Sequence, residues 1–239
     1  MRLIPIASSS KGNAYVVEHD GAGILIDCGV PYRMLREYEV SAVLITHDHS
    51  DHTSGLPVFL GRREVPVYAN MLTASAVAAD VKVPYESFVC FENGQDFEIG
   101  PFSVHPFSIP HDASDPVGYL IRAGGECYFH GTDIGTPLDS IGVKLAEADM
   151  ATLESNHDPV LLRTSARPAC LKQRIAGPRG HLSNDDAADL VRRFASPRLK
   201  RLYLAHLSHE CNVPRFAEET MCTALAEIGR TDISLEILA

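Results

Sequence analysis

Residues 46–52 read Thr-His-Asp-His-Ser-Asp-His and directly follow an apolar run at 42–45, Ala-Val-Leu-Ile. Four of them are potential metal ligands within six positions: His47, His49, Asp51 and His52. Imidazole nitrogens and carboxylate oxygens suit divalent ions such as zinc and manganese, whereas a structural zinc site is more often rich in cysteine. Four ligands exceed what one open catalytic ion usually takes from one loop, so the motif predicts a metal site and favours two ions. The alternative is a polar loop that happens to be rich in histidine.

The whole chain is typical of one globular domain. It has 239 residues, of which 45% are hydrophobic and 22% charged, so we expect a single domain over residues 1–239. Residues 1–6 are too short for the apolar core of a signal peptide, and no run approaches the length of a membrane span. We therefore expect a cytoplasmic protein with no membrane partner. The six cysteines lie far apart without a C-x-x-C pair, so most are expected to be buried, reduced core thiols.

Positive charge is concentrated in one part of an acidic chain. The formal net charge is −10, yet residues 159–209 contain ten Lys and Arg against three Asp and Glu. A basic stretch of this kind favours a polyanionic partner, although a solvated surface without a partner is the alternative. The chain has no tryptophan and shows no RNP or arginine-rich motif, so sequence-specific reading of nucleic acid is not predicted.

Short apolar runs alternate with helical patterns along the chain, which predicts a compact α/β fold. The expected strands cover 13–18, 23–27, 42–46, 65–68, 102–107, 117–122, 126–130, 199–205 and 233–238. The expected helices lie near 31–38, 54–61, 70–79 and 214–228, with another directly after Ser183. Ser183 and Asp186 have the spacing of a capping box, which places His181 just before that helix begins.

Several polar residues follow apolar strands at the point where each strand ends. They are Asp27, His47, Asp133, Glu154 and His206. In layered α/β folds the residues at one edge of the sheets converge on one cleft, where ligands bind. We therefore expect these side chains to lie close together.

Further motifs accompany the metal-binding run in a characteristic order. They are Ser-Ser-Ser-Lys-Gly-Asn at 8–13, His-Asp-Ala at 111–113, Pro-Val-Gly-Tyr at 116–119, Gly-Thr-Asp at 131–133, Glu-Ser-Asn-His-Asp at 154–158, Gly-His-Leu-Ser-Asn at 180–184 and Leu-Ala-His-Leu-Ser at 204–208. This series resembles the metallo-β-lactamase-fold hydrolases, specifically the WalJ/YycJ-like branch, which is related to tRNA 3′-processing endonucleases. The resemblance implies an αββα four-layer sandwich of the α/β class, with two sheets face to face and helices on the outer faces.

The same resemblance implies a site for two divalent ions, zinc or manganese, with iron also possible. Carried over residue by residue, His47, His49 and His111 would hold one ion, Asp51, His52 and His206 the other, and Asp133 would bridge them. Asp27 would accept a hydrogen bond from a ligand imidazole. Each position also has a plainer interpretation: His111, Asp133 and Asp27 as turn residues, and His206 as a core histidine.

Two close ions can hold a bridging hydroxide at neutral pH and bind substrate oxygens, which suits attack on phosphorus. Asp51, a predicted ligand of one of these ions, is also a candidate catalytic residue. The resemblance gives His181 the role of protonating the leaving alkoxide, with Glu154 nearby to orient it. A histidine that only packs against the following helix is the alternative for His181.

Candidate phosphate- and substrate-binding residues are Ser8, Ser9, Ser10, Lys11, Asn13, His157 and Ser183. The first five share a loop with hydroxyls, an ammonium and backbone N–H groups, and Ser183 opens a helix whose positive end faces the His181 region. Together these features predict a dinuclear-metal-dependent phosphodiesterase. The resemblance adds DNA as the partner and a polarity: a 5′-to-3′ exonuclease on duplex DNA that anchors the 5′-phosphate. The alternatives are a cyclic phosphodiesterase for small molecules, like the phosphonate-pathway enzyme, a thioester or lactam hydrolase, and a non-catalytic metal-binding module.

Overall fold

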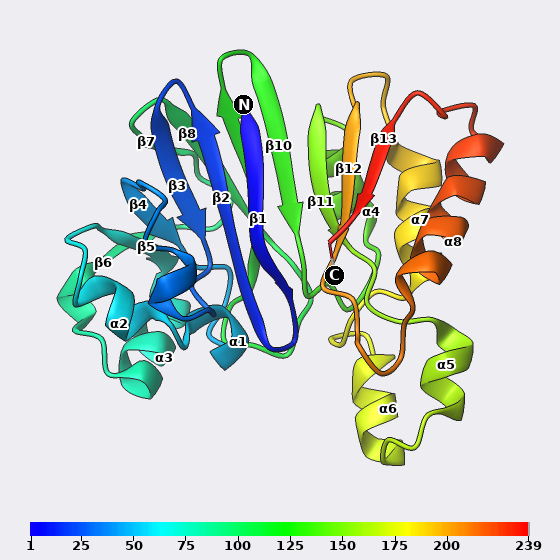
Figure 1. The fold of residues 1–239 in the computed structure, drawn as a ribbon, viewed down its shortest axis with the longest axis horizontal. Coiled ribbons are helices and arrows are strands. Elements are labelled where there is room, and N and C mark those ends of the chain that lie inside the picture. Colours follow the sequence, from blue (N-terminus) through cyan, green and yellow to red (C-terminus); the bar gives the residue numbers. More distant parts are fainter. Residues whose placement is uncertain (239) are drawn as a thin grey trace. The chain divides into compact units, whose positions relative to one another are not determined.

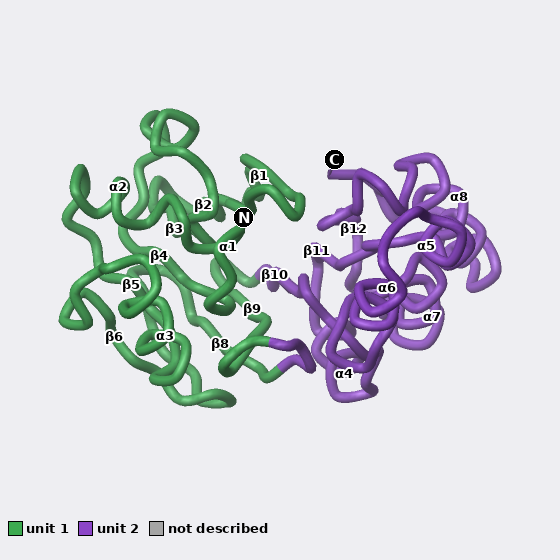
Figure 2. The backbone as a smooth tube through the Cα atoms, turned by 90° about the horizontal axis from the view of Figure 1, so that it is seen from below, with its two compact units in different colours: residues 1–108, 113–125 green, residues 109–112, 126–239 purple. Residues whose placement is uncertain are grey.

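The structure is a computed structural model that describes residues 1–238 (Figure 1). The chain divides into two compact units, which are described separately (Figure 2). Unit 1 consists of residues 1–108 and 113–125, and unit 2 of residues 109–112 and 126–239. The strands form two sheets, and helices accompany the strands in both units, as the predicted α/β class requires. Within residues 1–238, no helix combines the length and the apolar character that a membrane crossing needs.

The first sheet of unit 1 combines an antiparallel and a parallel half. Its strands follow the order of the chain: β1 (Arg2–Ser9), β2 (Gly12–His19), β3 (Ala22–Ile26), β4 (Ala42–Leu44), β5 (Val67–Asn70) and β6 (Phe88–Phe91). The first three strands are antiparallel neighbours, and β3 to β6 are parallel. Asp20 and Gly21 take positive φ values of 49° and 79°, as a tight two-residue hairpin between β2 and β3 requires. The predicted hairpin is therefore confirmed, whereas β1 was not predicted.

Three further strands of unit 1 form an antiparallel group: β7 (Phe97–Ile99), β8 (Phe102–Ser108) and β9 (Val117–Ala123). They pack against the first sheet of the same unit. The ring of Tyr68 on β5 stacks on that of Phe97 with centroids 5.3 Å apart, and the hydroxyl of the buried Tyr119 donates to the carbonyl of Ile45. Polar and aromatic contacts thus join the two layers of unit 1.

Helices cover the other side of the first sheet. They are α1 (Ser50–Thr53), α2 (Leu56–Leu60), α3 (Met71–Val81) and two 3₁₀ turns, η1 (Tyr32–Met34) and η2 (Tyr85–Ser87). Asn70 caps α3 by accepting from the backbone N–H of Thr73. The prediction of a helix over 31–38 is wrong, because η1 is the only helical part of that segment. Leu35 is buried and Tyr32 and Tyr38 pack against the same core, a spacing of three residues that suits a 3₁₀ turn rather than an α-helix.

The sheet strands of unit 2 are all parallel. They are β10 (Glu126–Gly131), β11 (Met150–Glu154), β12 (Arg201–Ala205) and β13 (Ser234–Ile237). Three helices pack in this unit: α4 (Asp139–Leu145), α7 (Asn184–Phe194) and α8 (Pro214–Glu227). The predicted capping box at the start of α7 is confirmed, since the Ser183 hydroxyl accepts from the Asp186 N–H and the Asp186 carboxylate accepts from the Ser183 N–H.

A helical pair that the sequence analysis did not predict lies between β11 and α7. It consists of α5 (Pro159–Thr164) and α6 (Ala169–Ile175), at the carboxyl ends of the unit 2 strands (Figure 1). Asp158 caps α5 by accepting from the N–H groups of Val160 and Leu161. Leu162, Ile175 and Cys211 form a small buried apolar cluster that holds the pair in place.

The prediction that most cysteines are buried is wrong. All six are free thiols, but Cys90, Cys170 and Cys222 are exposed, while Cys28, Cys127 and Cys211 are buried. Thiols are small enough to fit on either side of an amphipathic element, so residue type alone did not separate the two sets.

Candidate metal centre

The four predicted ligands of residues 46–52 lie close together in unit 1. His47 and His49 follow β4, and Asp51 and His52 lie in α1. The ring centroid of His47 lies 4.7 Å from that of His49 and 4.1 Å from that of His52. The Nε2 atom of His52 is 3.5 Å from the Asp51 carboxylate. His47 and His52 are buried, whereas His49 and Asp51 are half-buried.

A buried carboxylate fixes the orientation of two of these imidazoles. Asp27 follows β3 and accepts from His52 Nδ1 at 2.7 Å. It also accepts from the backbone N–H and the hydroxyl of Thr46, at 2.9 and 3.0 Å. Because the Thr46 hydroxyl donates to Asp27, its oxygen is left to accept from His47 Nδ1 at 3.0 Å. Both imidazoles therefore hold their proton on Nδ1, and the lone pair lies on Nε2.

Asn13 reaches the metal-binding run from β2. Its amide nitrogen lies 3.3 Å from the Asp51 carboxylate and 3.1 Å from His52 Nε2, and it donates to the Ser9 carbonyl at 2.9 Å. The side chain is fully buried. The structure thus places Asn13 beside two predicted ligands rather than on the surface.

The remaining loop residues predicted to bind phosphate differ in exposure. Ser8 is buried and accepts from the Tyr15 hydroxyl at 2.8 Å, and the Ser9 hydroxyl accepts from the Lys11 N–H at 3.2 Å. Ser10 and Lys11 form the exposed turn between β1 and β2. Their side chains are the ones of this loop that solvent reaches most readily.

Unit 2 brings together polar residues that follow neighbouring strands. Asp133 and His206 follow the parallel strands β10 and β12, and Glu154 is the last residue of β11, so all three lie at the edge where the carboxyl ends of these strands meet. His181 joins them from the loop before α7. Ligand atoms of these four residues all lie within 4.8 Å of one another.

Glu154 connects all parts of this cluster. Its Oε1 atom accepts from His181 Nδ1 at 2.8 Å and from His206 Nδ1 at 2.9 Å. Its Oε2 atom accepts from the backbone N–H groups of Ile134 and Leu182. Complete burial by itself would raise the pKa of Glu154, but the charge and hydrogen bond of His181 and the hydrogen bond of His206 outweigh it and bring the pKa to about 2. The bond of Glu154 to His181 agrees with the predicted orienting role, whereas its bond to His206 depends on the pairing of β11 with β12 and has no signal in the sequence.

His111 is held by the loop that carries His181. Its Nδ1 atom donates to the Gly180 carbonyl at 2.9 Å, and its Nε2 atom lies 3.6 Å from the Asp133 carboxylate. The Arg179 guanidinium donates to the His111 carbonyl at 2.9 Å. A Cβ atom on Gly180 would come within 2.2 Å of the carbonyl oxygens of Arg174 and Ile175, so only glycine fits this loop.

His181 is the most exposed member of the unit 2 cluster. About 20% of its side chain is exposed, against 2% for Asp133 and His206 and none for Glu154. Burial by itself would lower the pKa of His181, but the charge and hydrogen bond of Glu154, with the charge of Asp133, raise the pKa above its usual value. A histidine whose pKa is raised and whose side chain solvent can reach is suited to donate a proton to a bound substrate.

Three of the strand-end residues adopt an unusual backbone conformation. Asp27, Asp133 and His206 have φ values of 58°, 60° and 58°, in the left-handed region that side chains other than glycine seldom occupy. Backbone of this kind turns a side chain sharply out of its strand and is concentrated at functional sites. The side chains of Asp27, Asp133 and His206 therefore turn out of β3, β10 and β12 where these strands end, as residues of a functional site often do.

His157 and Ser183, two further candidates for substrate binding, lie at the carboxyl-terminal edge of unit 2. His157 is 4% exposed, its Nδ1 atom has no hydrogen-bond partner among the described residues, and burial lowers its pKa. The Ser183 hydroxyl lies 2.6 Å from the Asp186 carboxylate, so it takes part in capping α7. A role of either residue in substrate binding stays a prediction.

The donor groups in both units fit divalent ions. They are imidazoles and carboxylates without a cysteine, the set that zinc and manganese share. His52, His111 and His206 each use Nδ1 for a hydrogen bond to an oxygen, and His47 uses Nδ1 for the Thr46 hydroxyl. Such bonds to the second ring nitrogen are usual for histidines that bind metals through Nε2.

Known proteins are similar to this chain in sequence and in fold. The family model for the beta-lactamase superfamily domain matches residues 23–207. The structure superimposes on the metallo-β-lactamase fold protein YhfI from Bacillus subtilis with a TM-score of 0.76 and 18% sequence identity, covering 98% of this chain and 95% of that one. The chain therefore belongs to the beta-lactamase superfamily, has the metallo-β-lactamase fold predicted from its sequence, and is a metal-dependent hydrolase.

Two curated relatives define the branch. Exodeoxyribonuclease WalJ of Streptococcus pneumoniae is 32% identical over 234 residues, covering 93% of this chain and 87% of that protein. Exodeoxyribonuclease YycJ of Bacillus anthracis is 32% identical over 234 residues, covering 94% and 89%. Within the superfamily, the chain belongs to the WalJ/YycJ branch, as the sequence motifs indicated.

Proposed function

We propose that this protein is a metal-dependent nuclease, a 5′-to-3′ exonuclease that degrades duplex DNA from an anchored 5′-phosphate. The observation that carries the proposal is the cluster of Asp133, Glu154, His181 and His206 in unit 2, where one carboxylate holds both a predicted ligand and a predicted acid. Membership of the WalJ/YycJ branch supports DNA as the substrate. A DNA substrate is also the reason to propose a cytoplasmic location.

Seven residues are proposed to hold two divalent ions, zinc or manganese, in one domain that spans residues 1–239. The proposed ligands are His47, His49, Asp51, His52, His111, Asp133 and His206. The support is the donor chemistry within each unit, the fixed Nδ1 protons and the family membership. When bound, such ions lower the pKa of a water molecule toward neutrality and neutralise phosphate oxygens.

The protein's own residues supply orientation and a proton. Asp51 is proposed as a catalytic residue besides being a ligand, and Asn13 holds its carboxylate in place. Glu154 orients His181 through Nδ1, so the Nε2 nitrogen of His181 is the one that would protonate the leaving alkoxide. Ser10 and Lys11, exposed in the β1–β2 turn, are proposed to bind the 5′-phosphate, with Ser8 and Ser9 shaping the turn.

The test uses a panel of end-labelled DNA and RNA duplexes with either a 5′-phosphate or a 5′-hydroxyl, and metal analysis of each protein preparation. The wild type is expected to degrade the 5′-phosphorylated DNA duplex fastest and to release nucleotides from that end. His181→Ala should retain its metal and lose about 10²- to 10⁴-fold of the rate, whereas Asp51→Ala should lose metal as well. A metal-loaded wild type that leaves these duplexes intact but cleaves a small cyclic phosphodiester would contradict the nuclease function.

A further inference from the structure

The helical pair α5–α6 carries positive charge that the proposed catalytic residues do not use. Residues 159–182 contain no Asp or Glu, although the whole chain has a net charge of −10. The same segment contains five cations: Arg163, Arg167, Lys172, Arg174 and Arg179. We name residues 159–180 the basic arm.

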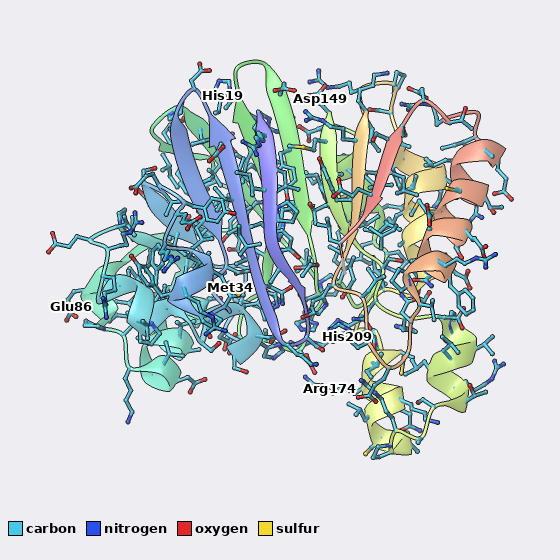
Figure 3. All side chains as sticks on the ribbon, viewed as in Figure 1. His19, Met34, Glu86, Asp149, Arg174 and His209 are labelled. Atoms are coloured by element: carbon cyan, nitrogen blue, oxygen red, sulfur yellow. The ribbon has the colours of Figure 1, made fainter. Side chains whose placement is uncertain are left out.

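The other cations of the predicted basic stretch each form an ion pair with a neighbouring carboxylate. The pairs are Arg192 with Glu227, Arg193 with Asp139 and Asp189, Arg198 with Asp149, Lys200 with Asp232, and Arg201 with Glu126. Arg198 and Arg201 lie at the amino ends of the unit 2 strands, whereas α6 lies at the carboxyl ends. Figure 3 shows Asp149, the partner of Arg198, and Arg174 at these opposite ends of unit 2. Surplus positive charge in unit 2 is therefore concentrated in the basic arm.

The cations of the basic arm differ in exposure and in pairing. Arg163 is exposed, and neither it nor Lys172 forms an ion pair within residues 1–238. The Arg174 side chain is 57% exposed and pairs with Asp112. The Arg167 side chain is 22% exposed and pairs with Glu210, whose side chain is 69% exposed. Exposed ion pairs contribute little anywhere in unit 2, so the basic arm differs in that Arg163 and Lys172 have no carboxylate partner among the described residues, whereas each of the five other cations has one.

The basic arm is joined directly to the loop that carries His181. The backbone N–H of His181 donates to the carbonyl of Ile175, the last residue of α6, at 2.9 Å, and the N–H of Gly180 donates to the Gly177 carbonyl. The close approach of Gly180 to α6 leaves no space for a side chain. An anion bound on the basic arm would thus be held by the same short segment that positions the predicted acid.

We propose that the basic arm is a docking surface for the sugar-phosphate backbone of duplex DNA. The proposal rests on the nuclease function proposed above and adds the surface that holds the substrate beside His181. Guanidinium and ammonium groups on two short helices bind phosphates through charge and release counterions, without reading bases. This fits a nuclease that must advance along any sequence, and it explains how a chain of net charge −10 can bind a polyanion.

Gln173 offers a test that removes no native contact. It is exposed on α6, next to Lys172 and Arg174, and its side chain makes no hydrogen bond in the part of the chain that the structure describes. Gln173→Lys should tighten binding of a fluorescent duplex, and Gln173→Glu should weaken it, each by up to about tenfold at 0.1 M salt, with the salt slope changing by about one. Anisotropy across a KCl series in EDTA measures both without metal or cleavage. Arg163→Gln should weaken binding in the same way.

Thr231 supplies the matched control. It is exposed in the loop before β13, at the amino end of the strand, so Thr231→Lys and Thr231→Glu change the same charge away from the basic arm. The proposal that the basic arm docks DNA would be wrong if the substitutions at Thr231 and Gln173 changed the DNA affinity equally. It would also be wrong if the wild type bound no duplex. If the DNA affinity changes with the charge at position 173 but the metal-loaded wild type cuts no duplex, the proposed nuclease function is wrong and the DNA-binding surface stands. Tighter, equally charge-dependent binding of an RNA duplex would exclude DNA as the docked partner.

Discussion

At the scale of single residues, the Thr46 hydroxyl links the buried Asp27 carboxylate to a predicted ligand. It donates to Asp27 and accepts from His47 Nδ1. Thr46→Val keeps the shape and removes this link, so His47 loses the group that fixes its ring. We expect metal affinity to fall about 10- to 100-fold, measured by competition with a chromogenic chelator. Thr152→Val is the control, since Thr152 is equally buried but its hydroxyl bonds Tyr128. Equal metal affinity in the two variants would show that the link to His47 has no role.

Variants of Glu154 and His181 should distinguish an effect on metal binding from an effect on proton donation. The two carboxylate oxygens of Glu154 accept hydrogen bonds from four donors, two on each oxygen. In Glu154→Gln an NH₂ group replaces one oxygen and therefore faces two donors to which it cannot bond. We expect this variant to lose activity, metal affinity and about 1–3 kcal/mol of stability. His181→Ala removes one donor and should retain metal and most stability. The measurements are metal content, urea unfolding and duplex cleavage. Full metal content in Glu154→Gln would contradict the link from Glu154 to His206.

How far the site could be predicted from sequence depended on how local each contact is. The run at 46–52 is contiguous, so its convergence followed from the motif alone. Asp133, Glu154 and His206 could be grouped because each follows an apolar strand, and parallel strands end at one edge. Asn13 was assigned to phosphate binding, yet it reaches Asp51 and His52 across 38 and 39 residues. Such contacts depend on strand pairing, which composition and periodicity do not specify.

At the scale of structural elements, the loop from α6 to α7 depends on one glycine. A Cβ atom at Gly180 would lie 2.2 Å from two carbonyl oxygens of α6. We expect Gly180→Ala to displace the loop that holds both His111 and His181, with a loss of about 1–3 kcal/mol in urea unfolding and a large loss of cleavage. Gly61→Ala is the control, because its nearest contact is 3.3 Å, and it should change stability by less than about 0.5 kcal/mol. A Gly180→Ala protein with wild-type stability and activity would show that the loop can adjust.

Elements with a clear sequence pattern were predicted well, including the short helix α2 within residues 54–61, whereas α4, α5 and α6 were not predicted. Helices α3, α7 and α8 and the hairpin of β2 with β3 were predicted within a few residues, because their patterns extend over several turns or flank a clear Asp-Gly turn. Helices α5 and α6 have six and seven residues and bury few side chains, so their sequence lacks a periodic face. Tertiary contacts through Leu162, Ile175 and Cys211, not propensity, hold them.

At the scale of the whole molecule, the net charge of the chain does not show where its positive charges lie. A chain of net charge −10 is repelled on average by DNA, yet most cations outside the basic arm have a carboxylate partner, whereas Arg163 and Lys172 in the arm have none among the described residues. The folded structure therefore separates the ten cations that the sequence analysis treated as one stretch. It also shows that Arg174 and Arg179, which contact Asp112 and the His111 carbonyl, are unsuited to testing DNA binding, because changing them would disturb a predicted ligand.

The cysteines can test whether the two units behave as one domain. Cys90, Cys170 and Cys222 are exposed and should react with an alkylating reagent in the native protein. Cys28 in unit 1 is buried, and burial, with the charge of Asp27, raises its pKa to about 12, so it should resist until unfolding because the thiolate is the reactive form. Cys211, buried in unit 2, should also resist.

If residues 1–239 form one cooperative domain, Cys28 and Cys211 should become reactive at the same urea concentration. Pulsed alkylation across a urea series, followed by peptide mapping, measures the midpoint for each thiol, and a fully unfolded sample in which all six react is the reference. The three exposed thiols act as internal standards, since their labelling should not depend on urea. Two separate midpoints would mean that each unit unfolds alone, and the single-domain prediction would then be wrong.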